Sequence, residues 1–277
     1  MFIICSIITT CSFFFLKETY APVLLAQRKR ELEKEHGGDY YLANEDTRPL
    51  QIKLLESACR PLRILFTQPI VMTMATYQAL IFATVYSLYT QFQPIYGGSY
   101  SFTTLQIGLV YLGPGLGSLF ALFFLVPRID TVYNSLTKKH NDIPLPEYRL
   151  PLANIGAVLI PLSIFAFAWL VEYHIHWVST LAATFCFGIG QVIIFNSVQN
   201  YYIDSFERYA ASAIAAGALF RSLVGGIIPM FTPLLLKRYG VGWGLSIFAF
   251  VGILLAPSPL LFYYYGASLR KRFSIEL

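Results

Sequence analysis

Residues 200–222 read NYYIDSFERYAASAIAAGALFRS, and this stretch decides the fold class. A short polar turn at 204–208 leads into a segment of alanine, serine and glycine, in which Arg221 is the first cation. Arg221 lies about 12 residues into that segment, which is roughly 18 Å along a helix. Small residues let membrane helices approach closely, and a charge at this depth is tolerated only toward other helices or a wet cavity. The stretch therefore predicts a helix packed inside a membrane bundle.

The composition of the chain agrees with a lipid environment. Of 277 residues, 56% are hydrophobic and 13% are charged, whereas soluble domains carry about 25% charged residues. The net charge of +5 does not indicate nucleic-acid binding, because membrane topology explains where the cations lie. No metal-ligand spacing and no Ser/His/Asp or Cys/His set is present, so we expect no metal, no cofactor and no enzymatic activity. The four cysteines, interpreted as small hydrophobic residues, are Cys5, Cys11, Cys59 and Cys186.

Apolar and polar stretches divide the chain into four parts. Residues 1–16 are apolar but shorter than the roughly 20 residues that span a bilayer. They also lack the basic start and cleavage site of a signal peptide, so we interpret them as the remnant of a span. Residues 17–68 form a polar loop with amphipathic surface helices, 69–265 hold the spans, and 266–277 form a polar tail. The six span-length segments are 70–92, 104–126, 152–171, 177–199, 209–235 and 243–265.

The placement of lysine and arginine predicts the orientation of these spans. One set of connections carries 17 of these cations, and the alternate set carries only Lys237 and Arg238. Cytoplasmic loops are the cation-rich ones, so we expect the first set and the C-terminus to be cytoplasmic. The cation-rich connections are 17–68, 127–151, 200–208 and 266–277.

Glycine and proline inside the spans predict how the helices pack. GPGLGS at 113–118 lacks the lysine of a phosphate-binding loop, and the spacing of Gly113, Gly117 and Ala121 instead indicates a helix-packing face. The same spacing at Ala218, Ser222 and Gly226 predicts a second such face. Proline within a span can bend a helix and free carbonyl groups toward a cavity, as we expect at Pro114, Pro161, Pro229 and Pro233.

Polar residues inside the spans are the candidates for a substrate cavity. Most amides in spans form helix–helix hydrogen bonds, so each candidate has a structural alternative. Arg221 is the strongest candidate, because it is too deep to reach the surface. We expect its partner to be Gln191 or Asn196, a carbonyl freed near Pro229, the substrate or a group outside this chain. The cavity candidates are Gln78, Tyr86, Tyr89, Gln191, Asn196 and Arg221.

Several motifs together resemble one family. KETYAPVLLAQRKREL at 17–32 is similar to the PETYxPVLL segment after the sixth helix of fungal drug:proton antiporters of the major facilitator superfamily. PEYRLP at 146–151 resembles the PExRLP loop before the ninth helix, and 187–216 resembles the tenth and eleventh helices. The resemblance covers nearly the whole chain. The family-motif residues that it implies are Glu147, Arg149, Asp204, Tyr209, Ser212 and Arg221.

Departures from the family pattern are also visible. Lys17 stands in place of proline, Gln68 in place of glutamate, and Gly217 where asparagine is common. The family has twelve spans, and this chain matches the last six with part of the sixth. We therefore expect an all-α, polytopic membrane helix bundle, the C-terminal six-helix half of a major facilitator fold plus a partial sixth helix.

The resemblance implies export of small amphipathic organic compounds, of the drug, toxin or polyamine class, by proton antiport at the plasma membrane. Membrane lipid, a small-molecule substrate, protons and the missing N-terminal half would be the partners, with no nucleic acid. Two alternatives stay open. One is a truncated, non-transporting membrane protein, and the other is a seven-span receptor, which the 15-residue first apolar segment at 2–16 disfavours.

Overall fold

The structure is a computed structural model that describes residues 2–15, 21–37, 40, 50–206 and 209–272. The described residues form helices and contain no strand, which confirms the all-α fold class. Parts of the polar loop predicted at 17–68 and the end of the tail predicted at 266–277 lie outside the described residues. The helices are α1 Phe2–Phe15, α2 Ala21–His36, α3 Leu50–Thr67, α4 Pro69–Ser99, α5 Thr104–Val110, α6 Leu112–Phe120, η1 Ala121–Leu125, α7 Val126–Lys139, η2 Pro146–Arg149, α8 Ala153–Glu172, α9 Trp177–Ser205, α10 Ala210–Leu255 and α11 Ser258–Arg272.

The chain divides into two compact units, residues 1–54 and 55–277. Within the first unit, α1 is a short apolar helix of 14 residues and α2 is a charged one. Ion pairs at helical spacing run along α2, from Arg28 to Glu31 at 3.0 Å and from Lys29 to Glu33 at 3.9 Å. Such exposed pairs add only a few tenths of a kcal/mol each to the stability of a helix.

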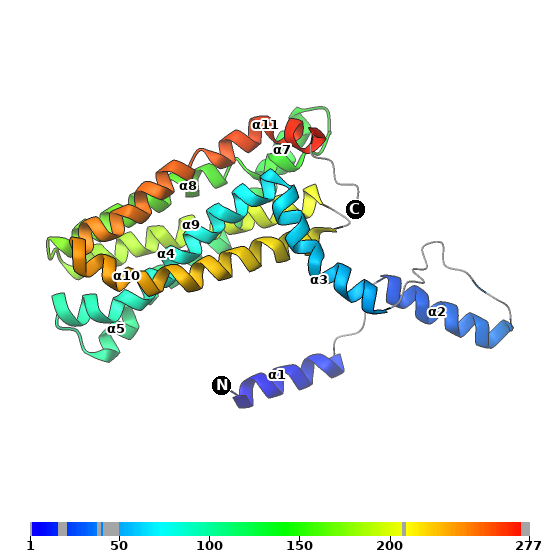
Figure 1. Ribbon diagram of the computed structural model, residues 1–277, viewed down its shortest axis with the longest axis horizontal. Helices are drawn as coiled ribbons and strands as arrows, with labels where there is room; N and C mark the ends of the chain where they lie inside the picture. Colours follow the sequence, from blue (N-terminus) through cyan, green and yellow to red (C-terminus); the bar gives the residue numbers. More distant parts are fainter. Residues whose placement is uncertain (1, 16–20, 38–39, 41–49, 207–208, 273–277) are drawn as a thin grey trace. The chain divides into compact units, whose positions relative to one another are not determined.

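Long apolar helices make up the second unit. Five helical stretches of the described residues are long and apolar enough to cross a membrane. The fifth, Ala210–Arg270, has 61 residues, about three times the length that a bilayer accepts. It is broken at Gly240, where φ is 77° and ψ is 172°, and the chain turns back there (Figure 1). Left-handed φ values suit glycine, because it has no Cβ. This break accounts for two of the six apolar segments seen in the sequence.

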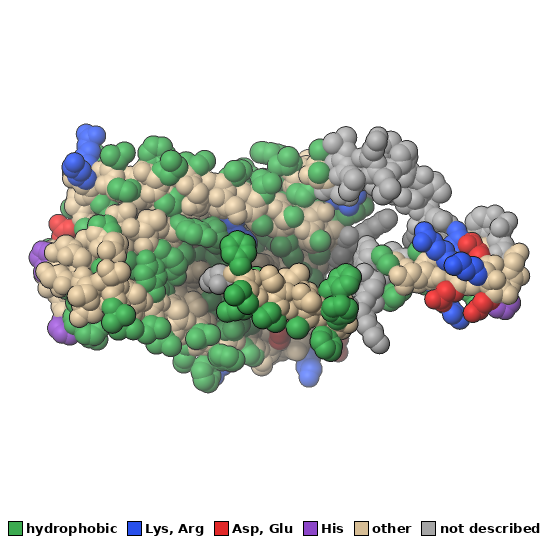
Figure 2. Space-filling model, turned by 90° about the horizontal axis from the view of Figure 1, so that it is seen from below, with side chains coloured by type: hydrophobic (Ala, Val, Ile, Leu, Met, Phe, Trp, Pro, Cys, Tyr) green, Lys and Arg blue, Asp and Glu red, His purple; other side chains and the backbone are tan. Residues whose placement is uncertain are grey.

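The outer surface of the bundle is apolar. In the stretch Thr104–Lys139, only 28% of the most apolar window is buried. Leu105 and Phe123 are 80% and 69% exposed. Figure 2 shows hydrophobic side chains spread over one face of the bundle, with few charged groups among them. So large an apolar surface is not sustained in water, so this unit is that of a multi-pass membrane protein.

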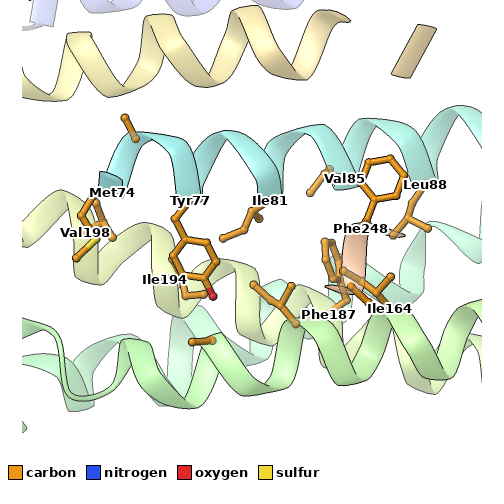
Figure 3. Close-up of a cluster of buried hydrophobic side chains, with 14 of the residues drawn as sticks. Met74, Tyr77, Ile81, Val85, Leu88, Ile164, Phe187, Ile194, Val198 and Phe248 are labelled. Atoms are coloured by element: carbon orange, nitrogen blue, oxygen red, sulfur yellow. The ribbon is translucent and has the colours of Figure 1, made fainter. Parts of the chain in front are cut away.

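The core lies where α4, α8 and α9 meet. Met74, Tyr77, Ile81 and Leu88 recur at helical spacing along α4 and are almost fully buried. Figure 3 shows them directed toward α8 and α9, where residues such as Phe187 fill the space between the helices. The spacing of three to four residues keeps them on one side of the helix. A different side of α4 is therefore left for α10.

Glycines bring α6 and α9 into backbone contact. A Cβ on Gly117 would lie 2.1 Å from the carbonyl oxygen of Phe185, and one on Gly188 would lie 2.3 Å from that of Pro114. Gly113 packs in the same way against Thr184. The packing face predicted from the GPGLGS spacing is thus confirmed, because only residues without a bulky side chain fit this approach.

The two ends of the bundle differ in chemistry. We call one the charged end, which holds Asp130, Glu147, Arg149, Asp204 and Arg270. We call the other the tryptophan end, where the rings of Trp169 and Trp243 lie 5.5 Å apart. At this end Glu172 accepts a hydrogen bond from the backbone N–H of Gly242 at 2.8 Å. That bond ties α8 to the reversal of α10.

Candidate substrate cavity

A cavity of about 720 Å³ opens between α4 and α10. Its volume is within the range of about 300–1,000 Å³ that is typical of small-molecule sites. The lining is mostly apolar and aromatic, with a few hydroxyl and amide groups, as such sites usually are. The lining residues are Phe82, Tyr86, Thr90, Gln91, Ser222, Gly225, Gly226, Pro229, Met230 and Pro233.

The side of α4 that meets α10 begins one turn below the cavity. Gln78, Phe82 and Tyr86 follow one another at four-residue spacing, so they lie above one another on one side of the helix. Phe82 and Tyr86 line the cavity, and their rings meet edge to face at 4.8 Å. Tyr86 keeps 45% of its surface exposed. Of the six predicted cavity candidates, Tyr86 is the one that lines this cavity directly.

Helix α10 approaches α4 through glycines at four-residue multiples. A Cβ on Gly225 would lie 2.8 Å from a ring carbon of Phe82, and one on Gly217 would lie 3.3 Å from Gln78 Oε1. Ser222 and Gly226 instead line the cavity, and nothing lies within 4 Å of a Cβ on Gly226. The packing face predicted at Ala218, Ser222 and Gly226 was therefore wrong. The contact runs one residue earlier, because all of α10 is rich in small residues and their spacing alone fits both sides.

Further along, a buried hydrogen bond joins α4 to α10. The hydroxyl groups of Ser87 and Thr232 lie 2.8 Å apart, and both residues are fully buried. Thr232 lies between Pro229 and Pro233, and both prolines line the cavity as the sequence led us to expect. A proline leaves a backbone carbonyl of its helix without a hydrogen bond, and such a carbonyl is costly when it faces lipid. A position beside a cavity avoids that cost.

Arg221 lies at the edge of the cavity beside two neighbouring aromatic rings. Its guanidinium carbon is 5.3 Å from the ring centroid of Phe82 and 5.4 Å from that of Phe195. Its Nε is buried and has no hydrogen-bond acceptor among the described residues. The amides of Gln191 and Asn196 make no such bond in the described part of the chain, which leaves the other predicted partners: a freed carbonyl, the substrate or a group outside this chain. Aromatic faces attract a cation but accept no conventional hydrogen bond.

Gln78 resembles Arg221 in having a donor without an acceptor. It is 1% exposed, and its Nε2 finds no hydrogen-bond partner among the described residues. Its neighbour Tyr202 is fully buried, and the hydroxyl of Tyr202 donates to the carbonyl of Val71 at 3.3 Å. An amide that is buried without its hydrogen bonds costs about 1–3 kcal/mol. Such a cost is more readily explained at a binding site than in a core.

Three other candidates lie away from this cavity in the described structure. Tyr89 packs against Tyr111 at 5.4 Å, and Tyr111 donates a hydrogen bond to its backbone carbonyl. The amide of Asn196 donates to the carbonyl of Val192 within its own helix at 2.9 Å. Gln191 is half-buried in α9. The amide donor of Asn196 is thereby satisfied within its own helix, which is the structural alternative for polar groups in spans, whereas the ring of Tyr89 packs against a neighbouring ring.

Phe82 and Phe195 are the residues that sequence reasoning missed. A phenylalanine in an apolar span gives no signal of its own, because most such residues face lipid or core. The spacing of four between Gln78 and Phe82 could have placed Phe82 on the same side of α4. Phe195 lies on α9, so only the tertiary structure shows that Arg221 lies beside the two rings.

At the charged end, Arg149 joins three elements. Its Nε donates to Asp204 of α9 at 2.8 Å, and its Nη1 donates to Asp130 of α7. Its guanidinium carbon also lies 4.0 Å above the ring of Tyr133. Burial lowers the pKa of Arg149, but the hydrogen bonds to Asp204 and Asp130 outweigh this and raise that pKa above its ordinary value. The side chain is held charged, so it works as a fixed electrostatic link.

A second ion pair at this end involves Glu147. It is 2% exposed and accepts two hydrogen bonds from Arg270 of α11, each 3.0 Å long.

Of the remaining motif residues, Tyr209 has the guanidinium of Arg60 5.0 Å from its ring centroid, and Ser212 is half-buried in α10. Glu147, Arg149 and Asp204 thus hold the charged end together, and none of the six motif residues lines the described cavity.

A helical membrane unit with a cavity of small-molecule size between two of its helices defines a polytopic membrane protein. Residues 1–229 match the family model described as Major Facilitator Superfamily. The chain belongs to this superfamily, which confirms the family read from its motifs.

Named relatives are fungal transporters. The chain is 37% identical over 264 residues to the MFS-type transporter penM of Penicillium rubens, covering 95% of this chain and 52% of that protein. It is 37% identical over 262 residues to the MFS-type efflux pump MFS2 of Trichophyton rubrum, covering 93% of this chain and 44% of that protein. It is 36% identical over 276 residues to the multidrug transporter mdrA of Aspergillus fumigatus, covering 98% of this chain and 44% of that protein.

The chain spans about half the length of these curated relatives. No solved structure gives a significant match. The family and the kind of relative therefore support a transporter, and an enzyme finds no support from either.

Proposed function

We propose that this chain forms one wall of a secondary active transporter that exports small amphipathic organic compounds. The observation that carries the proposal is the cavity of about 720 Å³ between α4 and α10, lined by aromatic, hydroxyl and glycine surfaces. Aromatic and apolar walls with a few polar groups suit loosely specific binding of flat, partly apolar molecules. The relatives named as an efflux pump and a multidrug transporter support export rather than uptake.

Transport by this family fold works through rocking of two halves around a central site. We therefore propose that the complete transporter needs a second half, with protons as the coupling ion and the plasma membrane as its location. The cation-rich charged end would face the cytoplasm. The described residues place no carboxylate in the lining of the cavity, so the proton carrier is proposed to lie elsewhere in the complete transporter.

Transport in reconstituted vesicles tests the proposal. We expect the chain co-assembled with a matching six-span N-terminal half to move a fluorescent amphipathic compound against its gradient when a pH difference is imposed. Gly226→Phe fills open space in the cavity and should abolish this flux while the protein remains folded. Gly115→Phe, a substitution at an exposed, open glycine of α6 outside the cavity lining, is the matched control and should leave flux unchanged.

Two results would contradict the proposal. Flux that survives Gly226→Phe would mean that substrate does not pass this cavity. Proton-coupled efflux by the 277-residue chain without any partner half would contradict the two-wall arrangement. Absence of flux from every assembly would favour the alternative of a non-transporting membrane protein.

A further inference from the structure

The cavity between α4 and α10 lies beside an arginine that no described acid neutralises. Arg221 takes part in no ion pair in the described part of the chain, and its Nε has no acceptor there. Its guanidinium faces Phe82, which lines the cavity, and the next residue in the chain, Ser222, lines it too. A charge deep in a membrane is costly unless a partner or a wet cavity compensates it. The cation is thus placed where a ligand could supply that partner.

Four acids of the bundle already have partners elsewhere. Asp130 and Asp204 are paired with Arg149, and Glu147 is paired with Arg270, all at the charged end. At the tryptophan end, Glu172 accepts a hydrogen bond from a backbone N–H of α10. No described lining residue of the cavity is acidic. The electrostatic field at the cavity edge is therefore dominated by Arg221 and is positive.

A second free donor lies on the facing helix. Gln78 precedes Phe82 by one turn of α4, and its buried Nε2 has no acceptor among the described residues. Gly217, one turn before Arg221 on α10, packs against the same amide. Both orphaned atoms, Gln78 Nε2 and Arg221 Nε, are donors only. Such atoms are satisfied by acceptor oxygens, and an anion offers the strongest ones.

The aromatic rings complete the recognition chemistry. Phe82 and Phe195 hold the guanidinium by cation–π contact, which leaves its planar edge for hydrogen bonds. Phe82 and Tyr86 present ring surfaces to the cavity, on which a flat apolar body can stack. A basic ligand such as a polyamine would instead meet a like charge at the edge of the cavity.

From these observations we propose that the cavity selects planar organic anions over neutral and cationic compounds, and that Arg221 is the residue that determines this selectivity. The ligand class is an aromatic or conjugated body carrying a carboxylate, sulfonate or acidic enolate. This inference rests on the proposed function and narrows its substrate class. The inference concerns the charge of the ligand that the cavity prefers. A binding measurement can therefore test it without any measurement of transport.

The test compares two fluorescent probes with the same aromatic body. 1-Anilinonaphthalene-8-sulfonate is an anion, and N-phenyl-1-naphthylamine is its neutral counterpart without the sulfonate. Each is titrated into the chain in phosphatidylcholine nanodiscs, with the signal of empty nanodiscs subtracted. We expect the anion to bind roughly tenfold more tightly than the neutral probe, as a charge-assisted hydrogen bond allows.

Variants locate the preference. Arg221→Gln should remove it and leave the affinity for the neutral probe unchanged, and Arg221→Lys should keep part of it. Arg238→Gln removes an exposed cation further along α10, just before the break at Gly240, and should change nothing. Gly226→Phe should weaken both probes, because it fills the cavity.

Equal affinity of the wild-type chain for the two probes would overturn the inference, and this measurement needs no variant to fold. An anion preference that survives Arg221→Gln, or an affinity for the anion that Gly226→Phe leaves unchanged, would overturn it as well. Efflux by the assembled transporter could then still uphold the proposed function. Conversely, a clear anion preference without any efflux would uphold the inference and contradict the proposed function.

Discussion

Two glycines of α6 allow a sharp test of how this bundle is packed. Gly117 is buried against α9, and a Cβ there would lie 2.1 Å from the carbonyl oxygen of Phe185. Gly115, two residues earlier on the same helix, is exposed and has nothing within 4 Å of its Cβ position. We expect Gly117→Ala to destabilise the protein and Gly115→Ala to leave it unchanged or stabilise it.

The size of the effect follows from the contact. The obstacle to Gly117→Ala is backbone, which cannot rotate away, so α6 and α9 must separate by about 1 Å to reach an ordinary contact distance, at a cost of about 1–3 kcal/mol. Gly115→Ala meets no obstacle and gains helix propensity of up to about 1 kcal/mol. Gly117→Ala gains the same helix propensity, so the two variants should differ by the steric cost alone, about 1–3 kcal/mol in the free energy of unfolding. Unfolding in mixed micelles, followed by circular dichroism, measures this difference.

Equal stability of the two variants would refute the reasoning. It would mean that α6 and α9 do not touch at Gly117 in the membrane. Gly188→Ala gives an independent check from the other helix, since its Cβ would lie 2.3 Å from the carbonyl oxygen of Pro114. It should resemble Gly117→Ala and not Gly115→Ala.

Three further predictions concern the charged end, the topology and Arg221. Glu147→Gln and Arg270→Gln should each lower the free energy of unfolding by about 3 kcal/mol, because Glu147 is buried and accepts two hydrogen bonds from Arg270. A double-mutant cycle should show that the two effects are coupled, and additive effects would argue against the pair. After replacement of the native cysteines, an impermeant thiol reagent applied to intact cells should label a cysteine at Ser99 but not one at Asn141, and labelling of Asn141 would reverse the orientation. In the assembled transporter, Arg221→Lys should lower transport more than membrane abundance, because the charge stays but the planar guanidinium is lost; normal transport per molecule would make Arg221 structural.

The membrane class of this protein was predictable from the sequence for a simple reason. A lipid surrounding requires apolar segments long enough to span the bilayer and places lysine and arginine in alternate loops. Both patterns involve residues that are close together in the chain, so the sequence shows them directly. The same holds for Gly113 and Gly117, because an otherwise bulky apolar span leaves only one stripe on which helices can meet. Motif residues such as Glu147 and Arg149 were likewise recognisable before their ion pairs were seen.

The cavity itself was less predictable. Small residues occupy α10 on several sides, so spacing alone favoured Ala218, Ser222 and Gly226, and only the position of α4 shows that Gly217 and Gly225 make the contact. Tyr89 and Asn196 carry polar groups that suit a cavity, yet the ring of Tyr89 packs against that of Tyr111, and the amide of Asn196 donates to a carbonyl of its own helix. A polar side chain in a span has several ways of finding a partner, and the sequence does not rank them.

The sequence by itself determined that this chain is a helical membrane protein of the major facilitator superfamily and that Arg221 must avoid lipid. Only the tertiary structure decided what Arg221 faces, which is the rings of Phe82 and Phe195, one on α4 and the other on α9. The physical reason is the range of the interactions. Hydrophobic periodicity and the cost of a buried charge act along a single helix, whereas a cation–π contact and a cavity exist only between helices that are distant in the chain.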